Sequence, residues 1–212
     1  SELIKSYSGY YRFIGKKPGI NQYEVVVEAI NTETNLSISK RVSFEVEKIY
    51  TIPESLYANL TLGNKKWRID KEASRHVQTG PGTSDEITWH THENESKYAS
   101  MYDDTYVFGY QNMIHETNGE VVGKVEPLHQ DFGPIEQNAN DDGEYENYPL
   151  GGYTTSWLYG GDWTLHMDGK GFIGSYVGGD HVYKITSHSK TRLSIKTLDA
   201  AGNYWYFVLT SE

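Results

Sequence analysis

The sequence predicts an all-β protein, and three observations lead to that prediction. Tyrosine and tryptophan, which favour strands, are abundant, with 18 Tyr and 5 Trp among 212 residues. Several segments alternate apolar and polar side chains at the period of two that a half-buried strand requires. Turn sequences such as Asp168-Gly169 and Ala201-Gly202-Asn203 separate these segments, and no segment predicts a helix.

The first 48 residues contain too few strands for a complete domain. Residues 23–30 (YEVVVEAI) alternate apolar and polar side chains, and residues 37–47 alternate again after a polar turn. An apolar run at residues 10–14 adds a short strand, whereas a complete two-sheet sandwich needs about seven strands. We therefore predict a partial domain at residues 1–48.

A linker and a second domain follow. Residues 49–56 contain a proline and no strand pattern, so we predict a linker there. Residues 57–212 form the second domain, which begins with a strand around Trp67 and continues into a hairpin that turns at Asn118-Gly119. Residues 127–152 lack periodicity and predict a long acidic loop, which in a compact domain is typical of function or mobility.

The C-terminal part of the second domain predicts a regular meander of short strands. The segments with this pattern are residues 162–167, 172–177, 182–187, 192–198 and 204–209. Long irregular insertions favour a β-sandwich of the jelly-roll type for the whole domain. The up-and-down order of the meander leaves a calycin-like β-barrel as the alternative.

Charge and composition exclude several classes of partner. The formal net charge is −10, which disfavours nucleic acid and anionic membranes because both require clustered Lys and Arg. No apolar stretch approaches the roughly 18 residues of a membrane-spanning helix. The sequence has no cysteine, so thiol catalysis and disulfides are absent. A neutral polysaccharide or oligosaccharide is compatible with this charge.

The first candidate binding segment surrounds Trp89. A sugar ring presents an apolar face and a rim of hydroxyl groups, which an aromatic ring and nearby polar side chains can contact. Trp89 lies in a polar stretch with Glu93 and Lys97, so we predict an exposed ring that stacks on a sugar. His76 is a further candidate for a polar contact.

The second candidate segment covers residues 151–163. Tyr153, Trp157 and Tyr159 stand at odd offsets, so on a strand they share one face. That face serves either as a stacking platform, with Asp162 as a polar contact, or as core. Two other tryptophans, Trp67 and Trp163, are predicted to be core, and Trp205 fits either environment.

The main suggestion of a metal site comes from one acidic loop. Asn138, Asn140 and Asp142 partly match the pattern of a calcium-binding loop. The pattern departs at its first position, which is Asn, and at its twelfth, where Pro149 replaces the bidentate Glu. We therefore expect a solvated loop and no cofactor, with a structural calcium ion as the alternative.

The sequence predicts a binding protein rather than an enzyme. It contains no nucleophile-elbow, zinc-protease or phosphate-loop motif. No predicted strand aligns two carboxylates on one face in the way that a glycosidase pair would suggest. The alternatives are a glycoside hydrolase or lyase, and a calycin-like module for a small apolar ligand or for adhesion.

Residues 17–47 resemble the C-terminal half of a PKD domain, an immunoglobulin-like β-sandwich of bacterial surface proteins. The resemblance depends on a Pro-Gly turn, a following tyrosine and alternating valines. Those positions are Pro18, Gly19, Tyr23, Val25 and Val27, with one extra residue before the tyrosine. The resemblance implies that residues 1–48 are a partial PKD domain; a short β-appendage on the main domain is the alternative.

The second domain resembles a domain of outer-membrane lipoproteins from Bacteroidetes polysaccharide-utilisation systems. The matching positions are Trp67, Asp70, His76, Gly80, Pro81, Trp89, Tyr102, Asp103, Asp104 and Phe108, followed by residues 171–176, 183–185, 193–195 and 205–206. The chain departs from the pattern in having a single Trp89 where a pair is expected, which leaves the identity of the glycan open.

That resemblance implies a function and a location. Those lipoproteins carry PKD domains ahead of this module and bind glycans at the cell surface beside a TonB-dependent importer. It implies that this chain is a non-catalytic surface glycan-binding protein of the outer membrane, anchored by lipid through a preceding N-terminal region. The aromatic candidates and the acidic charge favour a neutral β-glucan.

Overall fold

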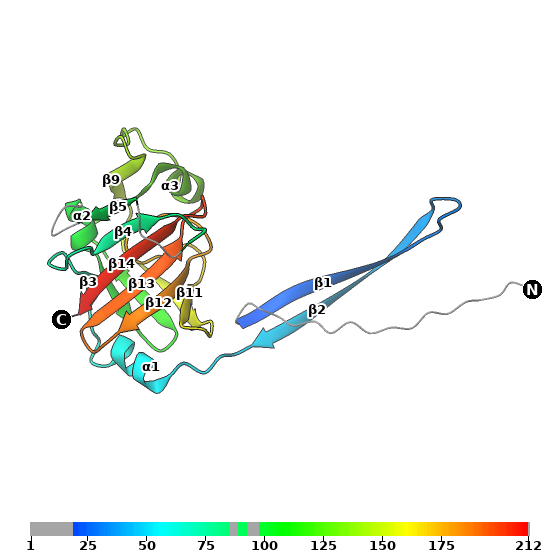
Figure 1. Cartoon of the computed structure of the whole chain (residues 1–212), viewed down its shortest axis with the longest axis horizontal. Coiled ribbons are helices and arrows are strands. Elements are labelled where there is room, and N and C mark those ends of the chain that lie inside the picture. The colour runs from blue at the N-terminus through cyan, green and yellow to red at the C-terminus, as the bar shows by residue number, and fades with distance from the viewer. Residues whose placement is uncertain (1–18, 85–88, 93–97, 212) are drawn as a thin grey trace, which may run out of the picture. The chain divides into compact units, whose positions relative to one another are not determined.

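The computed structural model describes residues 19–84, 89–92 and 98–211. Contacts along the chain divide it into two units, Ser1–Ile49 and Tyr50–Glu212. The described part of the first unit is a hairpin, and the second unit is a β-barrel with additions (Figure 1). The predicted short strand at residues 10–14 lies outside the described residues.

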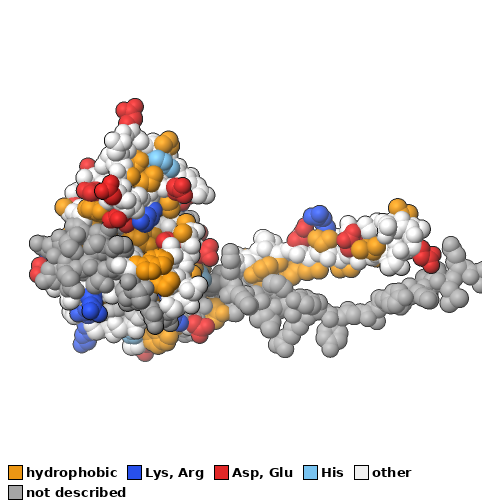
Figure 2. Space-filling model, turned by 45° about the horizontal axis from the view of Figure 1, so that its top comes forward, with side chains coloured by type: hydrophobic (Ala, Val, Ile, Leu, Met, Phe, Trp, Pro, Cys, Tyr) orange, Lys and Arg blue, Asp and Glu red, His pale blue; other side chains and the backbone are white. Residues whose placement is uncertain are grey.

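The first unit contains two long antiparallel strands, β1 (Gly19–Ile30) and β2 (Ser37–Lys48). Their pairing runs in one register from Gly19↔Lys48 to Ile30↔Ser37, which confirms the two predicted strands. The side chain of Asn31 closes the turn by accepting the backbone N–H groups of Glu33 and Thr34. Apolar side chains stay exposed along this hairpin (Figure 2), because the described residues of the first unit form a single two-stranded layer. That it is half of a PKD domain stays a prediction.

The second unit is a closed, antiparallel, eight-stranded barrel. Its strands are β3 (Trp67–Ile69), β6 (Thr105–Phe108), β7 (Asn112–Glu116), β10 (Tyr153–Tyr159), β11 (Thr164–Met167), β12 (Val182–His188), β13 (Arg192–Leu198) and β14 (Tyr204–Ser211). Each strand pairs with the next, and β14 closes the ring by pairing with both β13 and β3. The up-and-down barrel, our alternative, therefore describes this unit, and the preferred sandwich is wrong. Period-two alternation is the same in both folds, so the sequence pattern did not separate them.

Four further strands lie outside the ring of eight. β4 (Val77–Gly80) pairs with β14 beyond the end of β3, and β5 (His90–His92) pairs with β4. β8 (Glu120–Lys124) and β9 (Glu144–Pro149) form a separate ribbon. The predicted hairpin at Asn118-Gly119 is therefore wrong in its pairing: β8 turns away from β7 and joins β9, which leaves β10 as the barrel neighbour of β7.

Three short helices were not predicted: α1 (Glu54–Thr61), α2 (Ala99–Tyr102) and α3 (Val125–Phe132). Each is too short to display several turns of helical periodicity. Leu56 and Leu60 lie one turn apart on α1 and are fully buried in the barrel core. The carbonyl of Leu60 accepts a hydrogen bond from Trp67 Nε1 at 3.0 Å. The predicted linker at residues 49–56 therefore ends in a helix that closes one end of the barrel (Figure 1).

The other end of the barrel is filled by residues 168–181, which we call the plug segment. Tyrosine hydroxyls from the barrel wall hold its backbone: the N–H groups of Phe172, Ile173 and Gly174 donate to Tyr153, Tyr183 and Tyr106 at 2.9, 3.0 and 2.8 Å. The predicted strand at residues 172–177 is therefore wrong. Its alternating side chains are buried in two different hydrophobic cores. Ile173 packs in the barrel core, and Phe172 packs in a smaller cluster. The other members of that cluster are Val121, Leu128, Tyr145, Tyr148 and Tyr176.

Candidate functional site

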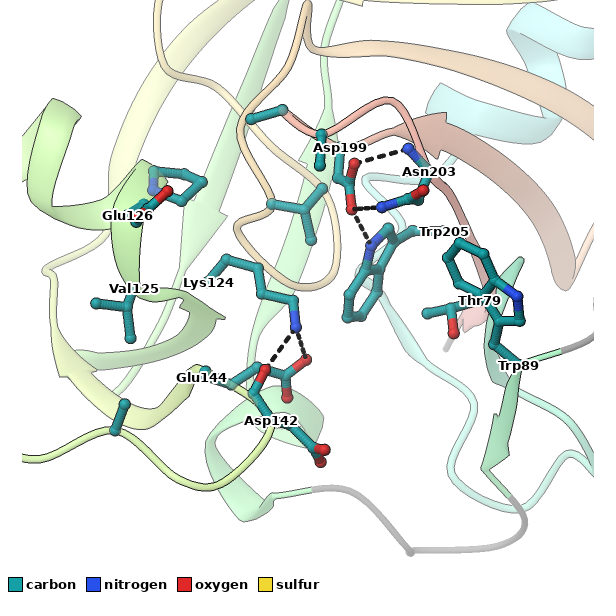
Figure 3. Close-up of a pocket in the computed structure, with 16 residues that line it drawn as sticks. Thr79, Trp89, Lys124, Val125, Glu126, Asp142, Glu144, Asp199, Asn203 and Trp205 are labelled. Carbon is teal, nitrogen blue, oxygen red and sulfur yellow. Dashed lines mark hydrogen bonds and ion pairs between the residues drawn. The ribbon is translucent and has the colours of Figure 1, made fainter. Parts of the chain in front are cut away.

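The main candidate site is a cavity of about 970 Å³ at the plugged end of the barrel (Figure 3). Strand β4, the start of α3, the loop before β9 and the turn between β13 and β14 surround it. We call it the Trp89 cavity; its lining residues are Thr79, Trp89, Lys124, Val125, Glu126, Pro127, Ala139, Asp142, Gly143, Glu144, Val177, Asp199, Ala200, Ala201, Asn203 and Trp205. Its size is typical of small-molecule binding sites.

Trp89 stands at the edge of this cavity with half of its surface exposed. Its exposed fraction is 51%, and its backbone N–H donates to the carbonyl of Thr79 at 3.2 Å. This bond extends the pairing of β5 with β4, so the backbone that carries the ring is anchored to the barrel. The prediction that Trp89 is exposed is confirmed.

Trp205 forms part of the cavity wall and is held by Asp199. It is only 4% exposed, and its Nε1 donates to Asp199 Oδ2 at 3.2 Å. Asp199 Oδ1 accepts the backbone N–H of Asn203 at 2.7 Å, and Asp199 Oδ2 accepts the amide of Asn203 at 3.3 Å. The carboxylate therefore fixes both the indole and the turn. The sequence did not decide whether Trp205 is core or exposed. Its strand buries alternate residues, and Trp205 lies where that strand begins, beside the cavity.

Lys124 brings a positive charge into the acidic wall. Its Nζ donates to the carbonyl of Asp142 at 2.9 Å and lies 3.3 Å from Glu144 Oε1. The same ammonium lies 5.4 Å from the centre of the Trp205 ring, within cation–π range. Glu144 is buried, so Lys124 compensates a carboxylate that would otherwise be costly to bury. Sequence reasoning missed both residues because they meet only when β8 pairs with β9.

The lining is acidic overall. Among the described residues, the carboxylates of Glu126, Asp142, Glu144 and Asp199 line the cavity with the ammonium of Lys124, four negative charges against one positive. Beside the cavity, burial and then the carboxylates of Glu144, Glu146 and Asp142 raise the pKa of Tyr98 to about 12. An anionic ligand would meet repulsion here, whereas a neutral or cationic one would not.

The loop that suggested calcium is organised by Asn140. Its side-chain oxygen accepts the backbone N–H groups of Asp142 and Glu144 at 3.1 and 2.9 Å, and its amide bonds to the Tyr98 hydroxyl. Asn138 is exposed. Within the described ranges, no group of three or more His, Asp or Glu side chains could hold a metal ion. Calcium at Asn138, Asn140 and Asp142 stays a prediction, and a turn-stabilising role accounts for the asparagine.

The second predicted platform does not form. Tyr153, Trp157 and Tyr159 do share one face of β10, but that face is directed into the barrel. Trp157 is 4% exposed and donates its Nε1 to the carbonyl of Asn112 at 3.1 Å. Tyr153 lies beneath the plug segment. The prediction of exposed stacking groups is therefore wrong for Tyr153 and Trp157, because closure of the barrel turned this face inward.

Tyr159 and Asp162 belong to the opposite end of the barrel. The Tyr159 hydroxyl accepts the backbone N–H of Trp163 at 3.2 Å, and Lys184 Nζ donates to the Asp162 carbonyl. Trp163 is 41% exposed, so its prediction as core is wrong. Both Asp162 and Trp163 have positive φ values, 46° and 60°, which rotate the indole out of the strand pattern.

His76 is a structural residue. It is fully buried, with Nδ1 3.0 Å from the Ala73 carbonyl and Nε2 2.7 Å from the Tyr102 hydroxyl. Its predicted contact with a ligand is therefore corrected. Glu93 and Lys97, the other polar candidates, lie outside the described residues.

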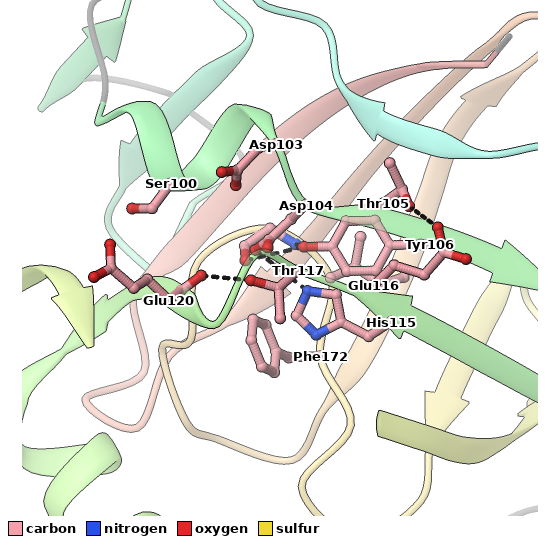
Figure 4. Close-up of polar contacts among 12 residues, drawn as sticks. Ser100, Asp103, Asp104, Thr105, Tyr106, His115, Glu116, Thr117, Glu120 and Phe172 are labelled. Atoms are coloured by element: carbon pink, nitrogen blue, oxygen red, sulfur yellow. Dashed lines mark hydrogen bonds and ion pairs between the residues drawn. The ribbon is translucent and has the colours of Figure 1, made fainter. Parts of the chain in front are cut away.

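A buried pair, His115 and Asp104, lies beneath the plug segment (Figure 4). His115 Nε2 lies 3.2 Å from Asp104 Oδ2, without the alignment of a directed hydrogen bond. Burial raises the pKa of Asp104, and the contact with His115 opposes that shift. The His115 ring stacks on Tyr106 at 4.9 Å. Both side chains are fully enclosed, so the pair supports the plug rather than a ligand.

Of the sequence candidates, the structure thus brings Trp89 and Asp142 to one cavity. The described part of the chain contains no helix long and apolar enough to cross a membrane. No protein-family model matches this chain, and no curated protein matches it. The Trp89 cavity is therefore the feature of this chain that bears on its function.

Proposed function

We propose that this protein captures a neutral polysaccharide, a β-glucan, in the Trp89 cavity and does not cleave it. The observation that carries the proposal is the half-exposed Trp89 ring at the edge of a cavity of about 970 Å³. An indole offers a flat apolar surface to a sugar ring at little conformational cost. The carboxylates, Asn203 and Lys124 offer acceptors and donors for the hydroxyl groups.

The charge of the lining supports a neutral glycan. Four carboxylates surround one ammonium among the described lining residues, and that ammonium already contacts Glu144. A uronic acid or a sulfated sugar would enter this field with Lys124, already in contact with Glu144, as the one cation among the lining residues that the structure describes. A neutral sugar avoids that cost and still uses the carboxylates as hydrogen-bond acceptors.

Two of the four lining carboxylates, Asp199 and Glu144, are held by neighbouring protein groups, which supports binding rather than catalysis by these two. Glycoside hydrolysis requires two carboxyl groups that face the scissile bond. Asp199 accepts hydrogen bonds from Asn203 and Trp205, and Glu144 pairs with Lys124. Both groups act on the walls of the cavity. The proposed setting, a lipid-anchored protein at the bacterial surface beside a TonB-dependent importer, rests on the sequence resemblance.

The proposal is tested by the variant Trp89→Ala with Trp163→Ala as its matched control. Trp163 is also substantially exposed but lies at the other end of the barrel. Retardation in native gels that contain β-glucan is expected for the wild type and for Trp163→Ala, and is expected to be lost for Trp89→Ala. Equal retardation of both variants would reject the site. Release of reducing sugar by the wild type would favour the hydrolase alternative.

A further inference from the structure

A second cavity, of about 680 Å³, adjoins the first on the outer side of strands β12, β13 and β14. We call it the Tyr204 cavity; its lining residues are Gly179, Asp180, Val182, Lys184, Lys196, Thr197, Leu198, Asp199, Ala200, Gly202 and Tyr204. Asp199 and Ala200 line both cavities. The plug segment also borders both, through Val177 on one side and Gly179 on the other.

Residues 199–203 form a rim between the two cavities, and hydrogen bonds hold this rim. The backbone N–H of Ala200 donates to the Val177 carbonyl at 3.1 Å, and that of Gly202 donates to the Asp199 carbonyl at 3.0 Å. A Cβ at Gly179 would lie 2.4 Å from the Leu198 carbonyl oxygen, so the plug segment presses directly against the rim. Ala200, Ala201 and Gly202 are exposed and have small side chains or none. The backbone of Gly82 packs against the Gly202 carbonyl, so the open part of the rim is at Ala200 and Ala201.

The Tyr204 cavity has the same kind of lining as the Trp89 cavity. Tyr204 is half-buried and has Lys196 Nζ 4.4 Å from its ring centre. Leu198 adds an exposed apolar side chain. Lys184 faces Lys196 across the β12–β13 pair. Two carboxylates and two ammonium groups line this cavity among the described residues, so its lining has no net charge that would favour an ionic ligand over a neutral one.

We infer that the two cavities form one continuous groove that binds a linear glycan along its length, across the rim at Ala200 and Ala201. The inference rests on the proposed function and specifies its ligand: an extended chain rather than a single sugar or a chain end. Once one segment of the chain occupies the Trp89 cavity, the next reaches the Tyr204 cavity at a high effective concentration. Affinity should therefore rise with chain length until both cavities are filled.

The test compares Tyr204→Ala with Tyr206→Ala by calorimetric titration of β-linked gluco-oligosaccharides of two and eight units. Tyr206 lies on the same outer face, 6.1 Å from Tyr204 between ring centres, but does not line the cavity. The expected result is a loss of about tenfold in affinity of Tyr204→Ala for the eight-unit ligand, the equivalent of one stacking contact. The two-unit ligand and the Tyr206→Ala variant should be unaffected. Leu198→Ser provides a second variant on the same wall, with the same expected pattern.

The outcomes separate this inference from the proposed function. If the wild type and Tyr204→Ala bind the eight-unit ligand equally, and Leu198→Ser does too, the groove is rejected while glycan capture at Trp89 stands. If the wild type binds both lengths with the same affinity, the groove is likewise rejected. If the wild type binds neither these oligosaccharides nor the parent β-glucan, the proposed function fails and the groove fails with it.

Discussion

At the scale of single residues, Lys124 shows how one charge organises a cavity wall. Its ammonium lies between the carboxylate of Glu144, the carbonyl of Asp142 and the ring of Trp205. Glu144 is buried, so Lys124→Met removes the ammonium that lies 3.3 Å from a buried carboxylate. We expect the variant to lower the free energy of unfolding by about 2 kcal/mol, because Lys124 is partly exposed and water screens part of the interaction. Urea denaturation measures this loss.

The matched control is Lys66→Met, which breaks the pair between Lys66 and Glu116. That pair is short, 2.6 Å, but both side chains are about half exposed, so its removal should cost less than about 1 kcal/mol. The double variant Lys124→Met/Glu144→Gln should recover part of the stability, because no unpaired charge is buried. Equal losses for Lys124→Met and Lys66→Met would contradict the role given to Lys124.

At the scale of elements, the plug segment depends on a glycine. Gly174 has a φ of +80°, and a Cβ there would lie 2.7 Å from the Phe207 ring. Gly174→Ala should therefore destabilise the barrel by about 3 kcal/mol, through both the left-handed backbone and the clash with a buried ring. Gly169→Ala is the control, because Gly169 has a φ of +55° but no atom near the added Cβ; it should cost about 1 kcal/mol. If thermal unfolding shows equal losses, the close approach to Phe207 is not what holds the plug.

The plug explains a prediction that pattern reasoning got wrong. Residues 172–177 alternate like a strand, yet they cross the end of the barrel and bond to tyrosine hydroxyls. An alternating pattern indicates only which side chains are buried. A segment that lies between two hydrophobic cores shows the same alternation without pairing to another strand.

At the scale of the whole molecule, buried tyrosines predict a loss of stability at alkaline pH. Burial raises the pKa of Tyr106, Tyr153, Tyr176 and Tyr183, and burial with neighbouring carboxylates raises that of Tyr98 to about 12. In the unfolded chain a tyrosine ionises near pH 10. The folded state therefore holds these protons longer, so its stability is complete below about pH 10 and falls as pH rises toward 12.

Two measurements check this pH dependence. The urea midpoint should be constant from neutral pH to about pH 9 and should decrease above about pH 10. Absorbance of ionised tyrosine should show part of the 18 tyrosines titrating only when the barrel unfolds. If all of them titrate near pH 10 in the folded protein, the hydroxyls that hold the plug are not enclosed.

Local signals recovered the C-terminal barrel strands and the hairpin of the first unit. β13 coincides with the predicted residues 192–198, and β1 and β2 contain the predicted segments. The sequence patterns gave wrong predictions where the same residue type occurs both in the core and on the surface. Trp157 and Trp163 are six positions apart, yet the first is core and the second is exposed, because Asp162 and Trp163 itself have positive φ values in the turn before β11.

The sequence by itself determined the all-β class, the acidic charge, and the exposure of Trp89 in a polar stretch. These follow from composition and from short-range patterns that any strand must satisfy. Only the tertiary structure decided that the sheet closes into a barrel, that Trp157 turns inward, and that Lys124, Glu144 and Trp205 meet at one cavity. The physical reason is that strand pairing joins residues far apart in the chain, and one-dimensional alternation carries no information about which strands pair.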